Sequence, residues 1–339
     1  MMPQVSVLLP VFDAEATLAA ALDTLLAQTL QEFEVVAVDD GSGDASGAVL
    51  REYERRDCRI RCITAPHEGL IPALNRGLAA CRAPLVARMD ADDLCHPHRL
   101  ESQCRWLRQD PSLSVLGSLV EPFPTPSVGE GFRIYVGWLN GLISHEEITR
   151  EIFIESPIVH PSAVVRRAEV LRLGGYQDRG WAEDYDLWLR YHAAGARFAK
   201  VPEVLVSWRE HPGRVTHRDS RYAVENFLRA KAHYLVYGPL RQRDALFVWG
   251  AGRTGRRLSK HLIRAGWRPQ AFVDIHPQKV GGSVRQVPVV APEALAHLWA
   301  QHRRPLLLAA VASRGARQLI RGQLGTLGLR ECEDFLCVA

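Results

Sequence analysis

The chain has 339 residues, of which 47% are hydrophobic and 24% are charged, and its formal net charge is +4. These values predict a globular protein of two ordinary domains and exclude a disordered chain. The charge is too small to indicate nucleic acid as a partner, although partners that carry phosphate stay compatible with it. The longest apolar runs are too short to span a membrane, so we expect peripheral membrane contact at most.

Seven cysteines are spread along the chain, and no two of them form a C-x-x-C pair. An odd number in a chain of this length does not indicate a disulfide framework. The first ten residues, MMPQVSVLLP, lack the basic region and the long apolar region of a signal peptide. We therefore predict a cytoplasmic location.

The first hundred residues alternate short apolar runs with helical segments. Helices are predicted over about residues 14–28, with Asp13 as N-cap, and over residues 70–81. The buried strands predicted from apolar runs are residues 5–11, 33–38, 61–64 and 84–89. This β-α-β-α-β order predicts an α/β domain with a largely parallel sheet.

The pattern becomes irregular after that region and starts again near residue 240. Residues 121–131, rich in proline and glycine, predict a surface loop, and a helix is predicted around residues 184–194. Further strands are predicted at residues 245–250, 271–274 and 305–311. We therefore expect one domain over residues 1–238 and a smaller α/β domain over residues 239–339.

Acidic residues follow three of the predicted strands, at Asp13, Asp39–Asp40 and Asp90–Asp93. Ligands of parallel α/β sheets bind at the carboxyl ends of the strands. Asp90 and Asp92, two positions apart, can point the same way and offer hard oxygen ligands to Mg²⁺ or Mn²⁺. An ion there could neutralise a diphosphate. The alternative is a solvated acidic loop in which Asp93 caps a helix.

Four segments in order carry a resemblance to a known family: PVFDAEATLAAALDTLL, VVAVDDGSGDAS, VARMDADD and GGYQDRGWAEDYDLWLR. Together they resemble the inverting family 2 glycosyltransferases with the GT-A fold, over about residues 3–218. The resemblance implies transfer of a sugar from a nucleotide-sugar donor, most often a UDP-sugar, to a hydroxyl acceptor. Polysaccharide or glycoconjugate synthesis would be the setting, with Mn²⁺ or Mg²⁺ as cofactor.

The resemblance also implies roles for residues on the nucleotide side. Pro10, Val11 and Asp13 match the first strand–helix junction, which lines the nucleoside pocket in the family. Asp40 matches the aspartate that accepts a hydrogen bond from the base. The segment HEG at residues 67–69 departs from the family's usual Asn-x-Gly opening, which leaves nucleotide or sugar preference open.

The remaining roles concern the diphosphate and the acceptor. Asp90 and Asp92 match the D-x-D motif that contacts ribose and the metal–diphosphate. His211 stands where family members often complete the metal site, although a basic surface loop explains it as well. Asp184 matches the general base, and Glu183 would orient acceptor or sugar. Both carboxylates also suit a helix N-terminus, which stabilises negative charge.

The second domain carries a glycine-rich turn between a predicted strand and a predicted helix. Gly250, Gly252 and Gly255 form G-x-G-x-x-G, and Asp274 ends the next strand. This arrangement predicts a Rossmann-like domain and a candidate second nucleotide site. The alternative is that the glycines serve only the turn and helix packing.

Three other functions are alternatives to the glycosyltransferase. A sugar-1-phosphate nucleotidyltransferase should carry a basic, glycine-rich signature after the first strand, and PVFDAEA lacks it. The sequence is also compatible with a non-catalytic protein that binds a nucleotide-sugar. A redox role for the second domain is the third alternative, but its sequence shows no set of catalytic residues for hydride transfer.

Overall fold

The computed structural model describes residues 2–124 and 128–339, and the chain divides into two compact units. Unit 1 comprises Met1–Ile148, Pro157–Arg179 and Asp186–Arg218, and unit 2 comprises Thr149–Ser156, Gly180–Tyr185 and Asp219–Ala339. Unit 2 thus takes in two short segments from earlier in the chain. The division after residue 238 stays a prediction.

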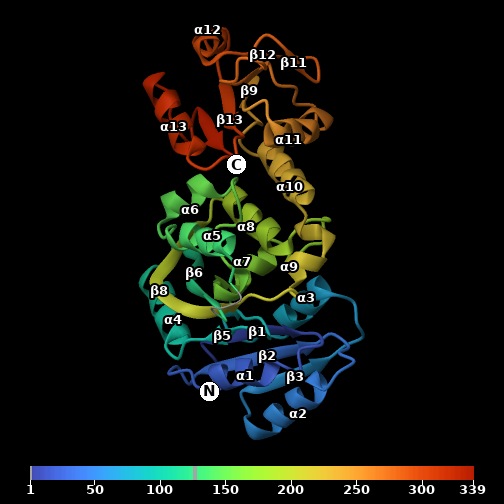
Figure 1. Ribbon diagram of the computed structural model, residues 1–339. Helices are drawn as coiled ribbons and strands as arrows, with labels where there is room; N and C mark the ends of the chain where they lie inside the picture. The colour runs from blue at the N-terminus through green and yellow to red at the C-terminus, as the bar shows by residue number, and fades with distance from the viewer. Residues whose placement is uncertain (1, 125–127) are drawn as a thin grey trace. The chain divides into compact units, whose positions relative to one another are not determined.

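Unit 1 is built on an eight-stranded sheet in the order β3-β2-β1-β4-β7-β6-β8-β5 (Figure 1). Its strands are β1 Val5–Val11, β2 Phe33–Asp39, β3 Ile60–Thr64, β4 Leu85–Arg88, β5 Leu94–Cys95, β6 Leu113–Phe123, β7 Val164–Arg166 and β8 Arg197–Arg209. The helices that begin in the same part of the chain are α1 Leu18–Leu26, α2 Ser46–Arg56, α3 Leu70–Ala80, α4 Arg99–Gln109, α5 Glu130–Asn140, α6 His145–Glu151, α7 Arg167–Arg172, α8 Glu183–Ala193 and α9 Val215–Arg218.

The first four strands run parallel, as their apolar sequences predict. All seven residues of β1 are buried, which fits a strand covered on both faces. Val11 pairs with Asp39, and Leu8 pairs with Arg88, so β1, β2 and β4 end at one edge of the sheet. This register brings the acidic turns after these strands to that edge.

Two sequence predictions and one alternative for this region are wrong. Strand β6 continues to Phe123 and α5 starts at Glu130, so the predicted loop over residues 121–131 is shorter; its residues 125–127 lie outside the described residues. Asp13 does not cap α1, because that helix starts at Leu18 after Thr17. Asp93 caps no helix either, because β5 follows it directly and α4 starts only at Arg99.

Unit 2 carries a six-stranded sheet in the order β11-β12-β10-β9-β13-β14, with all neighbours parallel except β11 and β12. Its elements are α10 Val224–Tyr237, β9 Ala245–Trp249, α11 Arg253–Arg264, β10 Ala271–Val273, β11 Ser283–Val284, β12 Val287–Val290, α12 Leu295–Trp299, β13 Pro305–Ala309, α13 Ala316–Thr326 and β14 Phe335–Cys337. The prediction of a second α/β sheet is confirmed.

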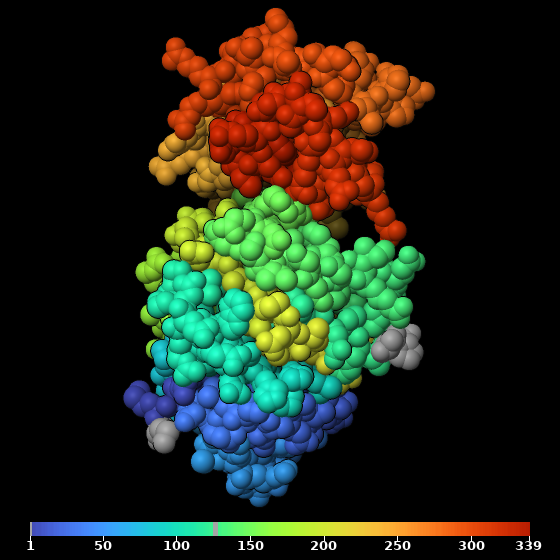
Figure 2. All heavy atoms as spheres, turned by 90° about the vertical axis from the view of Figure 1, so that its left-hand side faces the viewer, coloured from blue at the N-terminus to red at the C-terminus, as the bar shows by residue number. Residues whose placement is uncertain are grey.

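Helices lie on both sides of the second sheet. Figure 1 shows α11 on one side and α13 on the other, and α13 belongs to the red face that Figure 2 turns toward the viewer. Leu258 and Leu262 of α11 and Ile320 and Leu324 of α13 are buried. Among the helices of the described residues, none is long and apolar enough to cross a membrane.

Candidate active site

The acidic cluster after β4 is the centre of the candidate site in unit 1. Ligand oxygens of Asp90, Asp92 and Asp93 all lie within 4.8 Å of one another. Asp90 forms an ion pair with the buried guanidinium of Arg88. Asp93 is buried, and its Oδ1 accepts a hydrogen bond from the Arg209 backbone N–H at 2.7 Å. Within the described residues, the Oδ2 of Asp93 has no hydrogen-bond partner.

The electrostatics of this cluster favour a bound cation. Burial raises the pKa of the Asp93 carboxyl well above its ordinary value, and the charges of Asp90 and Asp92 raise it further. Burial also raises the pKa of Asp90, although Arg88 opposes this. Negative charge held in a desolvated place is costly unless a counter-charge is present. The three carboxylates, one of which has an oxygen without a partner in the described part of the chain, fit a divalent cation with oxygen ligands.

Strand β8 brings His211 to the cluster from 119 residues along the chain. The His211 Nε2 lies 2.9 Å from the Asp92 Oδ2, and the Gly213 backbone N–H donates to Nδ1 at 3.2 Å. Because Nδ1 accepts, Nε2 carries the proton in this arrangement. Arg209 Nε donates to the Asp92 carbonyl at 2.5 Å. The structure thus joins two residues that the sequence analysis assigned to one metal site.

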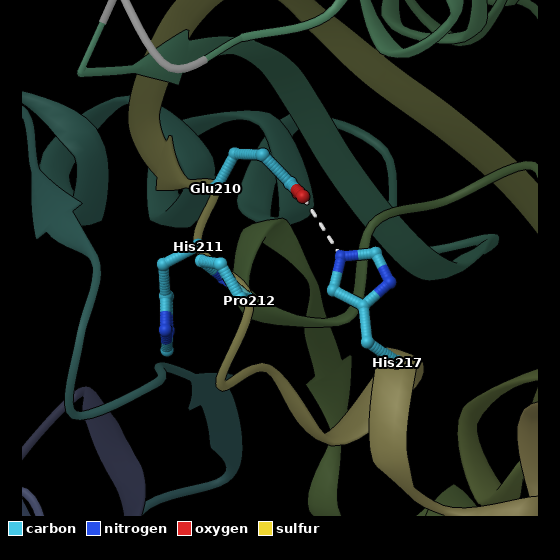
Figure 3. Close-up of a pocket in the computed structure, with 4 residues that line it drawn as sticks. All are labelled: Glu210, His211, Pro212 and His217. Atoms are coloured by element: carbon cyan, nitrogen blue, oxygen red, sulfur yellow. Dashed lines mark hydrogen bonds and ion pairs between the residues drawn. The ribbon is translucent and has the colours of Figure 1, made fainter.

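A hollow of about 510 Å³ opens beside this histidine and is lined by Glu210, His211, Pro212 and His217 (Figure 3). Glu210 holds His217 at 2.8 Å and Arg214 at 2.7 Å. The Arg214 guanidinium also lies over the Trp208 ring, 4.3 Å from its centre. Ion pairs therefore fix the loop after β8, and the hollow leaves room for a ligand next to His211.

Asp40, at the end of β2, organises the neighbouring turn. Its carboxylate is buried and accepts from the backbone N–H groups of Glu68 at 3.0 Å and Gly69 at 2.9 Å. His67 Nδ1 lies 2.8 Å from its Oδ2. The residues HEG that depart from the family pattern are thus the residues that hold Asp40.

The ring of Phe12 provides an aromatic surface next to Asp40. It stacks on His67 with ring centres 4.1 Å apart, and Phe12 is 46% exposed. An exposed, fixed aromatic face is suited to stacking against a nucleoside base. The sequence analysis did not single out Phe12, although its place directly after the first strand was a usable signal.

The other nucleotide-side residues support the turns at this edge. Pro10 and Val11 are buried in β1, and the Val11 carbonyl accepts from the Asp40 N–H at 2.9 Å. Asp13 has a left-handed φ of 46° and accepts from the Gly43 N–H at 2.8 Å. Pro10 and Val11 can therefore act through the backbone only, whereas Asp13 fixes the two turns together.

Glu183 and Asp184 belong to unit 2 and start α8. Glu183 is 1% exposed, and the Tyr222 hydroxyl lies 2.9 and 2.8 Å from its two carboxylate oxygens. Burial and the charge of Glu183 raise the pKa of Tyr222 well above its usual range, so the phenol remains a donor. Asp184 is half-buried, and its Oδ1 accepts from the Tyr185 N–H at 2.7 Å. Sequence reasoning missed Tyr222, for which no motif gives a signal.

The glycine-rich turn of unit 2 has a partly structural explanation. Gly250 has a φ of 112°, and a Cβ on Gly255 would lie 1.9 Å from the Gly250 carbonyl oxygen. A Cβ on Gly252 would meet nothing within 4 Å. The Asp274 carboxylate accepts from the Ala251 N–H at 2.9 Å and from Lys279 at 3.0 Å. Only Gly252 is left without a packing reason.

The comparison with known proteins decides the family. The model of the family described as Glycosyl transferase family 2 matches residues 6–174. The amylovoran biosynthesis glycosyltransferase AmsE of Erwinia amylovora is 32% identical over 210 residues, which cover 60% of this chain and 75% of AmsE. The chain belongs to glycosyltransferase family 2.

Two further similarities concern a sequence relative and a solved structure. An Escherichia coli protein named UDP-Gal:alpha-D-GlcNAc-diphosphoundecaprenol beta-1,3-galactosyltransferase is 29% identical, with 69% of this chain and 84% of that protein covered. The crystal structure of Staphylococcus aureus TarS residues 1–349 with UDP-GlcNAc superposes with a TM-score of 0.56 at 16% identity. It covers 78% of this chain and 72% of the TarS chain. The predicted GT-A fold is confirmed.

Proposed function

We propose that this glycosyltransferase is metal-dependent and inverting, and that it transfers a sugar from a UDP-sugar to a hydroxyl group. The observation that carries the proposal is the acidic cluster of Asp90, Asp92 and Asp93 with His211 against it. A lone acidic loop would leave its carboxylates in water. Here the carboxylate of buried Asp93 lies close to two more carboxylates, and one of its oxygens has no hydrogen-bond partner among the described residues, which supports a cation site.

The donor is assigned from the nucleotide side of the site and from the relatives. Phe12 offers a face to a base, Asp40 and Asp13 fix the turns, and Pro10 and Val11 line the junction. The galactosyltransferase relative is named for UDP-Gal, and the TarS structure holds UDP-GlcNAc. We infer that a UDP-sugar binds at this edge of unit 1, with Asp90 toward the ribose.

Asp92 and His211 would hold the metal ion, which we infer to be Mn²⁺ or Mg²⁺. When bound, it supplies positive charge that stabilises the diphosphate leaving group. The chain also provides cations of its own near the cluster, because Arg88 pairs with Asp90 and Arg209 with the Asp92 carbonyl.

Asp184 is proposed as the general base. Its carboxylate would take the proton of the acceptor hydroxyl as the hydroxyl oxygen bonds to the anomeric carbon. The bond from that carbon to the diphosphate oxygen breaks on the opposite face, so the anomeric configuration inverts. Glu183, held by Tyr222 through both oxygens, is proposed to orient the acceptor or the sugar beside it.

The acceptor class follows from the relatives in the same way. AmsE is named for amylovoran biosynthesis, and the galactosyltransferase is named for a sugar linked to diphosphoundecaprenol. We infer a glycan or glycoconjugate hydroxyl, in a protein that works in the cytoplasm. The accessory domain over residues 239–339 is proposed to be Rossmann-like, and Gly250, Gly252, Gly255 and Asp274 stay a candidate second nucleotide site.

The test is a transfer assay with a panel of UDP-sugars and GDP-sugars, glycolipid and soluble sugar acceptors, and Mn²⁺, Mg²⁺ or a chelator. The proposal expects turnover with a UDP-sugar that needs the metal, and a product of inverted configuration by NMR. A retained configuration would contradict the inverting mechanism. Donor binding without turnover for every acceptor would favour the non-catalytic alternative.

A further inference from the structure

The two parts of the chain differ sharply in charge. Residues 1–218 hold 23 Lys and Arg against 30 Asp and Glu, whereas residues 219–339 hold 19 Lys and Arg against 8 Asp and Glu. The net charge of +4 for the whole chain hides a C-terminal part of +11. Such an asymmetry indicates an anionic partner for the basic part.

Many of these positive charges gather along one edge of the second sheet. Strands β12, β10, β9, β13 and β14 are parallel neighbours, so the residues that precede them lie at one edge. Exposed arginines precede every one of these five strands: Arg285, Arg268, Arg241, Arg303 with Arg304, and Arg330. We call these six residues the arginine edge.

Hydrogen bonds join neighbouring segments of the arginine edge. Arg268 donates to the Arg285 carbonyl at 3.0 Å. The Asp244 carboxylate accepts from the backbone N–H groups of Arg303 at 2.8 Å and Arg304 at 3.0 Å. With a spacing of about 4.8 Å between strands, the row extends over roughly 20 Å. Figure 1 shows the C-terminus, which follows β14, at the opposite edge of this sheet.

The charges on this edge are largely uncompensated. In the described part of the chain, the side chains of Arg241, Arg285 and Arg303 make no hydrogen bond or ion pair. The Arg304 guanidinium donates to the neutral amide oxygen of Gln242 at 3.1 Å. Arg330 is the exception, because it pairs with Glu333 and Asp334. Free guanidinium groups in a row present bidentate donors to phosphate groups.

We propose that the arginine edge docks unit 2 on an anionic phospholipid bilayer. Exposed arginines along one edge of a sheet can meet a phosphate-bearing surface together, and each would add to the attraction. Tyr237 ends α10 four residues before Arg241 and is 70% exposed, which suits the interfacial layer of a membrane.

The choice of a membrane over nucleic acid rests on the proposed function. A relative of this chain is named for an acceptor linked to diphosphoundecaprenol, a lipid. None of the described helices crosses a membrane. A glycosyltransferase with such an acceptor would have to reach the lipid from the aqueous side, and a basic edge offers the contact.

The test is co-sedimentation of the full chain with phosphatidylcholine vesicles, with and without phosphatidylglycerol, at low and raised salt. Binding is expected only to the anionic vesicles and is expected to weaken with salt. The triple variant Arg241→Gln/Arg285→Gln/Arg303→Gln should lose binding on the order of a hundredfold, at roughly fivefold per arginine.

The matched control, Arg82→Gln/Arg172→Gln/Arg314→Gln, removes the same charge from exposed arginines elsewhere and should keep most of the binding. Equal binding to neutral vesicles, equal loss in both triple variants, or binding to a DNA or RNA homopolymer without vesicle binding would each overturn the proposal. Transfer to a soluble acceptor without vesicles is measured in parallel, so a failure of the proposed function shows separately.

Discussion

The two sheets of this chain use opposite edges and opposite charges. In unit 1, carboxylates gather after the carboxyl ends of β2 and β4, where Asp40, Asp90, Asp92 and Asp93 stand. In unit 2, arginines precede the amino ends of five parallel strands. A parallel sheet gathers distant residues at either edge, and the loops decide what each edge can bind.

Burial separates the two regions further. Asp93 is 1% exposed and has an oxygen without a partner in the described residues, so the cluster is costly without a counter-ion. The six residues of the arginine edge are exposed, where an unpaired charge costs little and its attraction weakens with salt. The first arrangement is suited to holding one small ligand tightly, and the second to attracting a large surface weakly.

The largest expected effect comes from removing the proposed base. Asp184→Asn keeps the shape of the side chain but cannot take a proton, so kcat should fall by about 10²–10⁴-fold while UDP binding is retained. Asp178→Asn, at an exposed position nearby in sequence, should leave kcat unchanged. Steady-state assays of both variants check this. Wild-type turnover in Asp184→Asn would show that the chemistry does not depend on this carboxylate.

The glycines of the second sheet's turn should respond unequally. Gly255→Ala places a Cβ 1.9 Å from the Gly250 carbonyl and should lower the free energy of unfolding by about 2–3 kcal/mol. Gly252→Ala meets nothing within 4 Å and should change it by less than about 0.5 kcal/mol. Denaturant titrations of both variants make the comparison. If Gly252→Ala proves as costly as Gly255→Ala, the packing account of this turn fails.

Lys200 is a buried lysine in unit 1, in contrast to the exposed residues of the arginine edge. It is 1% exposed, its Nζ donates to the Leu139 carbonyl at 2.5 Å, and burial lowers its pKa to about 7. In the unfolded chain, Lys200 has its ordinary pKa of 10.5. Between pH 7 and that value, the unfolded chain therefore binds more protons than the folded chain does. Wild-type stability should therefore rise relative to Lys200→Met by about 2 kcal/mol from pH 7 to pH 9.

Denaturant titrations of the wild type and Lys200→Met at pH 6, 7, 8 and 9 measure this difference. Below pH 7 the lysine is charged in both the folded and the unfolded chain, so the difference should be flat there. Parallel stability curves over the whole range would mean that Lys200 does not titrate near pH 7.

A smaller effect is expected at Tyr222, which we assign as a positioning residue. Tyr222→Phe leaves the buried Glu183 carboxylate without its phenol donor, so kcat should fall by about tenfold with the donor KM unchanged. The acid limb of the pH profile of kcat should move to higher pH, because the charged form of the Glu183 carboxylate loses a hydrogen bond in this variant.

Tyr53→Phe is the matched control for that variant. It removes a phenol–carboxylate hydrogen bond of 2.7 Å to Asp23, between α2 and α1. The control should lower stability without moving the pH profile. A Tyr222→Phe enzyme with an unshifted profile and full kcat would make the contact purely structural.

Much of the first unit could be predicted from its sequence. Strand β1 is a nearly continuous apolar run and β4 begins with three apolar residues, and such runs are typical of buried parallel strands. Strand β8 was not predicted, because Lys200, Pro202 and Glu203 interrupt its apolar residues. Asp13 failed as a cap because its left-handed backbone turns the chain before the helix begins.

The candidate site could be predicted only in part. Each sequence motif identified candidate residues within itself. The contact of Asp92 with His211 joins residues 119 positions apart and depends on the path of β8, so no single motif predicts it. The contact of Tyr222 with Glu183 has no sequence pattern at all. The arginine edge was hidden for another reason, since the net charge averages a basic part with an acidic one.

The central claim is that the acidic cluster binds the diphosphate of the donor through a divalent cation. Calorimetric titration of UDP into the wild type and into Asp92→Ala, each with Mn²⁺ and with a chelator, tests it most directly. The account predicts that Mn²⁺ strengthens binding to the wild type by at least about tenfold and does little for Asp92→Ala. Equal UDP affinity with Mn²⁺ and chelator in the wild type, or an unchanged Mn²⁺ effect in the variant, would contradict it.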